Sequence, residues 1–367
     1  MKFRIFICLL FACFQMQAQT TIADSIQFDN RWRTFRLFLP SSYSDGQNLP
    51  LVFNLHGYGS NALEQEIYSG FDGIANTANV LVCYPNGLNN SWNFTSTNPD
   101  DIGFIDTLIT IFRRQYRINL NRVYATGMSN GGFMCNALAC ELSNRIAAIA
   151  PVAGTSTSSM LSTCSPVRKV PVLYIHGTAD QVVSYEGSLL FTSAYDLMEL
   201  WSNRNQCSIV SDTLPLPDIS PGDNCTAQRI SWSDCMNNSE VVHYRILNGG
   251  HTWPGSSILI GITNMDFNAS HTIWEFFSRH SLNNNFPATL DNVSLFPNPF
   301  QSGFSIRLPF PAEALVKIYS SDGRLIHSAL YSQNPISISG ISPDAGLYFV
   351  NVIYNGYSKS IRLVHSR

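Results

Sequence analysis

The stretch Gly127-Met128-Ser129-Asn130-Gly131 decides the fold of this 367-residue chain. It is a G-x-S-x-G pentapeptide. The residues before it, 122–126, predict a short strand, and those after it, 132–139, predict a helix. A serine at such a strand-to-helix turn projects its hydroxyl clear of the sheet, because the flanking glycines let the chain bend without Cβ clashes. An ordinary Ser-Gly turn can have the same sequence. The motif therefore indicates a nucleophile only if a candidate base and acid occur elsewhere in the chain.

The rest of the first 280 residues alternates between strand and helix patterns. Nearly continuous apolar runs at 50–55, 80–85, 146–151 and 170–175 predict buried strands, and alternation predicts strands at 35–39 and 240–246. Apolar residues at helical spacing predict helices at 102–116, 189–201 and 273–279. This order predicts an α/β fold with a largely parallel sheet covered on both faces, whose functional loops follow the carboxyl ends of strands.

Composition excludes several classes of protein. Hydrophobic residues make up 45% of the chain and charged residues 13%, which indicates a globular protein rather than a disordered one. The formal net charge is −3 and Lys and Arg do not cluster, so there is no electrostatic case for nucleic acid or an anionic membrane surface. We also expect no transmembrane segment, because no apolar run beyond the first residues reaches about 18.

The first 18 residues read as a signal peptide. Lys2 and Arg4 precede a short apolar run at 5–14, and Ala18 offers a small residue for cleavage. A first buried element is the alternative, and Leu10-Phe11-Ala12-Cys13 fits a lipoprotein cleavage box loosely. We therefore expect export, and with it an environment in which disulfides persist.

Seven cysteines follow the expected signal peptide. Because the number is odd, at least one thiol stays free or pairs between chains. We expect a Cys140–Cys164 bridge, one bridge among Cys207, Cys225 and Cys235, and a buried free thiol at Cys83 at the end of an apolar run. The spacings offer no metal-binding pattern, so we expect neither a metal nor an organic cofactor.

A serine nucleophile needs a base, usually a histidine oriented by a carboxylate. Asp180 lies in His176-Gly177-Thr178-Ala179-Asp180, directly after a predicted core strand, and is the candidate acid. Its competitors are Asp196, in a predicted helix, and Asp218 and Asp223, in a Pro/Gly-rich insert. His251 lies in the loop Gly249-Gly250-His251-Thr252-Trp253-Pro254 after the strand ending near 247, and is the candidate base. The chain order Ser, Asp, His is that of the elbow type of hydrolase.

Two backbone N–H groups should hold the oxyanion of the tetrahedral intermediate. We assign one to Asn130, directly after the nucleophile, and the other to Tyr58, in the loop His56-Gly57-Tyr58-Gly59 after an early central strand. Trp253, Trp92 and Tyr185 lie near these loops and are candidates to bind substrate. Each of these three aromatics fits the core equally well.

These motifs together resemble the secreted polyhydroxybutyrate-depolymerase-like and feruloyl-esterase-like α/β-hydrolases, a group that overlaps carbohydrate esterase family 1. The resemblance covers roughly residues 22–282. It is carried by the loops around Tyr58, Ser129, Asp180 and His251, and by Tyr84-Pro85-Asn86-Gly87, Asp100-Asp101-Ile102-Gly103 and Ala148-Ile149-Ala150-Pro151. It implies an α/β-hydrolase fold and ester hydrolysis, with Ser129, Asp180 and His251 as the triad.

A second module is expected at 293–367, after a linker at 283–292 that contains Asn283-Asn284-Asn285 and Pro287. Short alternating runs broken by turns predict a small all-β sandwich. Leu295-Phe296-Pro297-Asn298-Pro299-Phe300 and Ala345-Gly346-Leu347-Tyr348 resemble the type A C-terminal sorting domain of the type IX secretion system. The resemblance implies the secretion machinery as a partner. A carbohydrate-binding sandwich is the alternative.

The sequence therefore predicts a secreted serine esterase that acts on feruloyl or acetyl esters of plant polysaccharide. Low charge and aromatic content favour a neutral sugar-aryl ligand. A polyhydroxybutyrate or other polyester depolymerase is the alternative. A serine peptidase and a non-catalytic binding protein on the same scaffold are further rivals, which a casein assay and fluorophosphonate labelling would separate from an esterase.

Overall fold

The computed structural model describes residues 20–44, 46–95, 98–208, 211–282, 293–308, 314–331, 333, 335–340, 344–354 and 357–366. The chain divides into two compact units, Met1–Asn285 and Phe286–Arg367. The expected signal peptide and linker, 1–18 and 283–292, lie outside the described residues.

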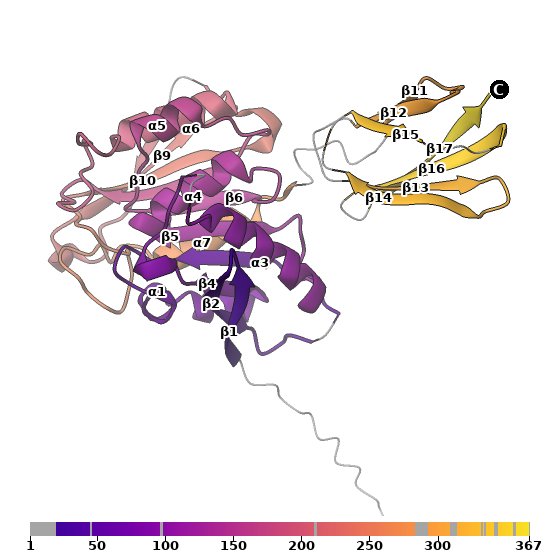
Figure 1. The fold of residues 1–367 in the computed structure, drawn as a ribbon. Coiled ribbons are helices and arrows are strands. Elements are labelled where there is room, and N and C mark those ends of the chain that lie inside the picture. The colour runs from indigo at the N-terminus through magenta and orange to yellow at the C-terminus, as the bar shows by residue number, and fades with distance from the viewer. Residues whose placement is uncertain are drawn as a thin grey trace, which may run out of the picture. The chain divides into compact units, whose positions relative to one another are not determined.

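A single ten-stranded sheet forms the centre of the first unit, in the order β1-β2-β4-β3-β5-β6-β7-β10-β9-β8 (Figure 1). The six strands from β4 to β10 run parallel, and antiparallel pairs close both edges. The strands are β1 (Thr20–Phe28), β2 (Arg31–Leu39), β3 (Leu51–Leu55), β4 (Leu81–Pro85), β5 (Val123–Met128), β6 (Ala148–Val152), β7 (Val172–Gly177), β8 (Ser211–Pro215), β9 (Thr226–Trp232) and β10 (Val241–Leu247).

Helices cover both faces of this sheet, as expected for an α/β fold. One apolar cluster joins the sheet to α3, α4 and α6, and a second joins it to α1, α2 and α7. Leu51 and Phe53 of β3 belong to the first cluster, whereas Val52 between them belongs to the second, so alternate residues of one strand face opposite layers. The helices are α1 (Ala62–Ser69), α2 (Phe71–Ala78), α3 (Asp101–Gln115), α4 (Asn130–Glu141), α5 (Ser158–Thr163), α6 (Ala194–Asn205) and α7 (Ala269–Ser278).

The helix expected at 189–201 begins five residues later than the sequence pattern indicated. Ser193 caps α6: its hydroxyl accepts from the Asp196 amide at 3.0 Å, and the Asp196 carboxylate accepts from the Ser193 amide at 3.0 Å. Such a reciprocal capping box fixes the start of a helix. Leu189 and Leu190 therefore lie in the preceding loop, where their side chains are exposed.

The second unit is all-β. One antiparallel sheet contains β11 (Ser294–Phe296), β12 (Gly303–Arg307) and β15 (Ile336–Ser339). The other has the order β14-β13-β16-β17 and contains β13 (Ala314–Ser320), β14 (Leu325–Tyr331), β16 (Gly346–Tyr354) and β17 (Tyr357–His365). Burial alternates along β13, and its inward residues Val316 and Ile318 pack in a small apolar core of their own.

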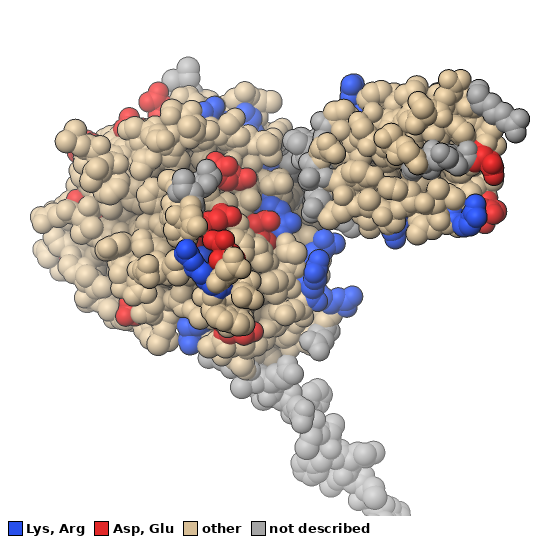
Figure 2. All heavy atoms as spheres, viewed as in Figure 1, with Lys and Arg blue, Asp and Glu red and all other residues tan. Residues whose placement is uncertain are grey.

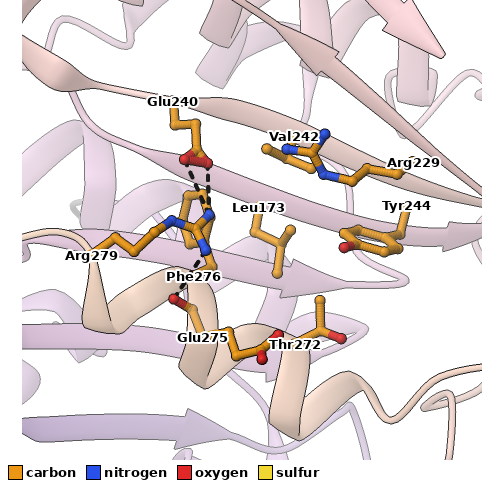
Figure 3. Close-up of a pocket in the computed structure, with 9 residues that line it drawn as sticks. All are labelled: Leu173, Arg229, Glu240, Val242, Tyr244, Thr272, Glu275, Phe276 and Arg279. Atoms are coloured by element: carbon orange, nitrogen blue, oxygen red, sulfur yellow. Dashed lines mark hydrogen bonds and ion pairs between the residues drawn. The ribbon is translucent and has the colours of Figure 1, made fainter. Parts of the chain in front are cut away.

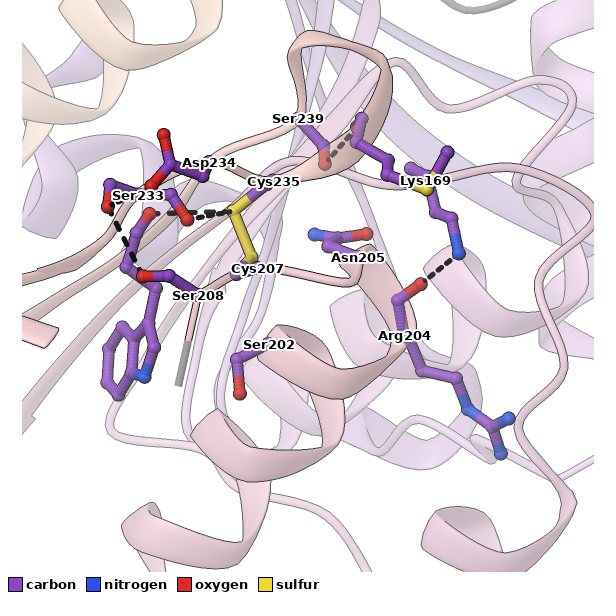
Figure 4. Close-up of a disulfide and its surroundings, with 12 residues drawn as sticks. Lys169, Ser202, Arg204, Asn205, Cys207, Ser208, Ser233, Asp234, Cys235 and Ser239 are labelled. Carbon is purple, nitrogen blue, oxygen red and sulfur yellow. Dashed lines mark hydrogen bonds between the residues drawn. A yellow bond between two sulfur atoms is a disulfide. The ribbon is translucent and has the colours of Figure 1, made fainter. Parts of the chain in front are cut away.

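Both expected disulfides are present. Cys140 bonds to Cys164, and Cys207, just after α6, bonds to Cys235, after β9 (Figure 4). Cys83 is a buried free thiol, as predicted. The second bridge ties the edge strands β8 and β9 to the end of α6, so it anchors a part of the sheet that buries little apolar surface.

Candidate active site

Ser129 lies at a sharp turn between β5 and α4. Its backbone has φ 55° and ψ −118°, a conformation that costs a residue with a Cβ about 1–3 kcal/mol. The surrounding structure holds it there, because the Ser129 amide donates to Val152 O of β6 at 2.8 Å and its carbonyl accepts from the Gly132 amide at 2.7 Å. The turn has the geometry of a nucleophile elbow.

The glycines on either side of Ser129 are required by the neighbouring strand. A Cβ placed on Gly127 would lie 2.7 Å from Leu55 O of β3, and one on Gly131 would lie 2.2 Å from the same atom. Real Cβ atoms do not approach a carbonyl oxygen so closely. The G-x-S-x-G spacing therefore lets the turn and the end of β3 approach each other.

Asp180 and His251 are in direct contact, although 71 residues separate them. His251 Nδ1 lies 2.6 Å from Asp180 Oδ2. The Asp180 side chain is fully buried, whereas 19% of the His251 side chain is exposed. A carboxylate thus holds one ring nitrogen of a histidine that is still open to solvent, as a general base requires.

Backbone bonds between two neighbouring loops create this contact. β7 and β10 are parallel neighbours, so the loops after them start at the same edge of the sheet. The Thr178 amide donates to Ile246 O at 2.8 Å, and the Ala179 amide donates to Gly249 O at 2.9 Å. A Cβ on Gly177 would lie 2.2 Å from Gly249 O, so glycine is needed where the loops cross.

The charge of Asp180 is set by the donors around it. Burial alone favours the neutral acid, but hydrogen bonds from His176 and His251 outweigh it and hold the pKa of Asp180 well below its usual value. Its other oxygen, Oδ1, accepts from the Val182 amide at 2.8 Å and the Val183 amide at 2.9 Å. Asp180 is therefore a buried carboxylate, ionised at neutral pH.

The loop after β3 packs against the turn that holds Ser129. A Cβ on Gly57 would lie 3.5 Å from Ser129 Cβ, so the residue directly before Tyr58 contacts the turn of the nucleophile. Asn130 is the first residue of α4, where backbone N–H groups have no intrahelical acceptor. Its side chain is engaged elsewhere, since Asn130 Oδ1 accepts from the Trp92 amide at 2.6 Å.

The three aromatic residues expected to bind substrate do not face solvent. Trp253 is 1% exposed, and Trp92 and Tyr185 are each 2% exposed. Trp253 Nε1 donates to Ser270 Oγ at 3.1 Å, Trp92 Nε1 donates to His56 O at 3.0 Å, and the Tyr185 hydroxyl bonds to His243. They are core residues with satisfied polar tips, which corrects their assignment to substrate contact. Tyr58, by contrast, is 79% exposed.

Sequence reasoning missed two buried histidines that support the site. His56 Nε2 accepts from the Gly87 amide at 2.9 Å and its Nδ1 lies 2.7 Å from Gly57 O, which fixes the Tyr58 loop. Burial lowers the pKa of His56, so the ring is neutral, as this pattern of one acceptor and one donor requires. His176 contacts Asp180. Both histidines follow or end predicted core strands, and that position is the signal that points to them.

A separate cleft lies between α7 and the strands β7, β9 and β10 (Figure 3). Arg279 Nη2 donates to both oxygens of Glu240, at 2.8 and 3.1 Å. None of the predicted site residues lines it; its lining is Leu173, Arg229, Glu240, Val242, Tyr244, Thr272, Glu275, Phe276 and Arg279. Arg279 and Glu240 form an ion pair in the cleft, and we place no chemistry there.

Known proteins resemble both units. Residues 294–366 match the model of the secretion system C-terminal sorting domain. A putative esterase, NocK of Nocardia uniformis subsp. tsuyamanensis, is 28% identical over 287 residues, covering 70% of this chain and 82% of its own length. Feruloyl esterase D of Neurospora crassa is 28% identical over 276 residues, covering 71% and 85%. The acetyl xylan esterase structure from Aspergillus awamori superposes with a TM-score of 0.51 at 14% identity, covering 71% and 99%.

The first unit thus has an α/β-hydrolase fold and resembles esterases, and the second unit matches a secretion system sorting domain. The sequence-based expectations of fold and of carboxylic-ester hydrolysis are therefore confirmed, and the tail supports secretion of the esterase. Among the described residues of the esterase, no helix is both long and apolar enough to cross a membrane. On the face in Figure 2, charged side chains are scattered over a mostly uncharged surface, in keeping with the 13% charged residues.

Proposed function

We propose that Ser129, His251 and Asp180 form the catalytic triad of a secreted serine esterase that hydrolyses feruloyl or acetyl esters of plant polysaccharide. The observation that carries the proposal is the 2.6 Å contact between His251 Nδ1 and Asp180 Oδ2. It lies on loops that start at the same sheet edge as the elbow, because β5, β6, β7 and β10 are successive parallel strands.

The contact dictates the protonation of the base. Asp180 accepts only through oxygen, so the Nδ1 of His251 carries the hydrogen and Nε2 is left with a free lone pair. Nε2 takes the proton from Ser129 Oγ as this oxygen attacks the ester carbonyl. Of the hydrogen bonds within the described residues, none joins Ser129 to His251, and such bonds often tighten only when substrate is bound.

Two backbone amides receive the negative charge of the tetrahedral intermediate. The Asn130 amide heads a helix, where the positive end of the helix dipole adds to its effect. The Tyr58 amide belongs to the loop after β3, whose Gly57 packs against Ser129. The imidazolium of His251 then protonates the leaving alcohol. Water, deprotonated by the same ring, attacks the acyl-serine ester and releases the acid and free Ser129.

The substrate class is supported by the relatives named above, one a feruloyl esterase and one, in structure, an acetyl xylan esterase. A panel of methyl ferulate, acetylated xylan and p-nitrophenyl acetate tests it. We expect turnover of all three, and Ser129→Ala and His251→Ala should each remove essentially all of it. His271→Ala is the control, because the His271 side chain is exposed on α7. Substantial turnover by Ser129→Ala would defeat the proposal.

A polyester is the second candidate substrate, and a specific surface favours it. The Gly250 amide, next to His251, donates to Ile262 O at 2.9 Å, which holds the segment 258–262 beside the base. Ile258, Leu259 and Ile260 are all exposed there, Leu259 by 66%. Aliphatic side chains contact an apolar polymer better than a hydrated sugar. Faster turnover of a hydroxybutyrate oligomer than of methyl ferulate would make the polyester the main substrate.

A further inference from the structure

His176 lies near the end of β7, four residues before the candidate acid, and projects into the core. Its side chain has no exposed surface. Its Nε2 lies 3.0 Å from Asp180 Oδ2 and 2.9 Å from Val183 O. Asp180 Oδ2 is the same oxygen that receives His251. Two imidazole rings therefore converge on one carboxylate oxygen.

The contacts around the His176 ring fix which of its nitrogens carries hydrogen. Asp180 Oδ2 and Val183 O are both acceptors, so Nε2 must be the donor. Nδ1 then accepts in a neutral ring, and its partner is the hydroxyl of Tyr174, which is also fully buried. Both ring nitrogens thus have a hydrogen-bond partner, with Nε2 as the donor to Asp180.

We propose that His176 is a positioning residue for the catalytic acid: held by Tyr174 as a neutral Nε2–H imidazole, it donates to Asp180 and thereby sets how strongly Asp180 attracts the proton on His251. This inference rests on the triad proposed above. His176 itself touches no reacting atom, and it acts only through Asp180.

The direction of the expected change in the pH profile follows from the way the two imidazole donors share the negative charge of Asp180. A donor on Oδ2 draws negative charge away from the bond to His251. When the donor is lost, the carboxylate becomes more basic and stabilises the His251 imidazolium more strongly. The base then stays protonated to a higher pH, so the acidic limb of the kcat/KM profile moves upward. Asp180 also loses one of its anchors, so kcat falls while substrate binding is unaffected.

Other titratable groups surround His176 and Asp180, and their charge states bear on how the pH profile is interpreted. Tyr174, Tyr185 and His243 pack around His176, and Arg245 lies near Tyr185. Burial raises the pKa of both tyrosines and lowers the pKa of His243 to about 3. These three groups therefore stay neutral across the working range of pH and do not contribute to the acidic limb.

The experiment compares pH profiles of the full-length esterase and its variants on p-nitrophenyl acetate. We expect His176→Phe to lower kcat roughly tenfold to a hundredfold, to leave KM within about twofold, and to move the acidic limb up by about half a unit or more. His176→Gln keeps a donor near the position of Nε2 and should recover much of the loss. Tyr174→Phe should shift the limb in the same direction by less.

His243→Phe is the matched control. His243 is equally buried and its ring bonds to the Tyr185 hydroxyl at 2.8 Å, but no hydrogen bond joins it to Asp180 among the described residues. It should lower the melting temperature and leave the acidic limb in place. An unmoved limb in His176→Phe, or the same shift in His243→Phe, would overturn the proposal.

A measurement on the unaltered protein guards against variants that fail to fold. Nitrogen-15 spectra of labelled histidine report the tautomer of each ring, and we expect one buried ring to be neutral with hydrogen on Nε2 and to lose this signal in His176→Gln. A doubly protonated ring, or hydrogen on Nδ1, would contradict the inference. Activity retained by Ser129→Ala would instead defeat the triad, so the two failures are distinguishable.

Discussion

Two aspartates in the esterase unit have pKa values shifted in opposite directions. The buried Asp180 accepts four hydrogen bonds, two from backbone amides and two from imidazoles, and its pKa is lowered. The partly buried Asp72, on α2, accepts one from the Tyr84 hydroxyl at 2.7 Å and lies beside Glu66; burial first, and then Glu66, raise its pKa to about 7. The comparison teaches that burial alone does not decide the charge of a carboxyl group. The hydrogen-bond donors and the charges around it decide whether the effect of burial is outweighed.

The largest effect is expected on catalysis. Asp180→Asn keeps the shape of the side chain but replaces one acceptor oxygen by an NH₂ group, so His251 no longer has a charged acceptor to hold its tautomer. We expect kcat/KM on p-nitrophenyl acetate to fall about 10⁴-fold. Asp218→Asn, an exposed acid in the insert before β9, is the control. Activity within tenfold of the parent in Asp180→Asn would remove Asp180 from the triad.

The second effect is on acid stability. The folded pKa of Asp180 lies below its unfolded value near 3.8, so its contribution to stability is complete above the unfolded value and is lost as the pH falls through the folded one. Urea unfolding between pH 6 and pH 2 should show the parent losing stability faster than Asp180→Asn at the acidic end. Parallel curves for the two proteins would contradict the lowered pKa.

The contribution of Asp72 to stability should depend on pH in the opposite direction. Its folded pKa is raised from 3.8 to about 7, so its contribution is complete below the unfolded value and is lost as the pH rises through the folded one. Asp72→Asn should therefore raise the melting temperature at pH 8 and leave it nearly unchanged at pH 4. A variant less stable than the parent at pH 8 would show that ionising Asp72 does not cost the fold stability.

The smallest effect is expected from Glu66→Gln. Removing the neighbouring charge lets Asp72 ionise at lower pH, so stability should depend less on pH between 4 and 7 than in the parent. Arg36 and Thr21 bond to Glu66 and lose a charged partner, which lowers stability at every pH and does not affect the slope. The slope of melting temperature against pH is the readout, and an unchanged slope would assign the raised pKa of Asp72 to burial alone.

Sequence alone predicted the parts of the fold that are continuously apolar. β3, β4 and β7 are buried on both faces, so each reads as a short hydrophobic run. β1 and β8 were missed because they are edge strands whose residues are exposed or half-buried, and their letters carry no apolar pattern. Their place depends on pairing with β2 and β9, which periodicity does not reveal.

The contact between Asp180 and His251 was predictable because both residues follow strands in the chain order expected of a triad. Ser129, Asp180 and His251 each follow a strand, and that position set them apart from competitors such as Asp196, which caps α6 instead. The end of a core strand marks the position of His176, but its contact with Asp180 was not predictable, because only the folded loop brings the two side chains together. Trp253 was misassigned for the converse reason: nearness to His251 in sequence does not show that a side chain points to solvent.

The pairing of β10 with β7 also has a consequence for folding. Asp180 and His251 meet only after β10 has docked beside β7, and the two residues are 71 positions apart. Forming such a distant contact carries a loop-closure cost that local contacts avoid, so we expect it late in folding. The rate at which a fluorophosphonate labels the chain during refolding would then report when β10, the last central strand, joins the sheet.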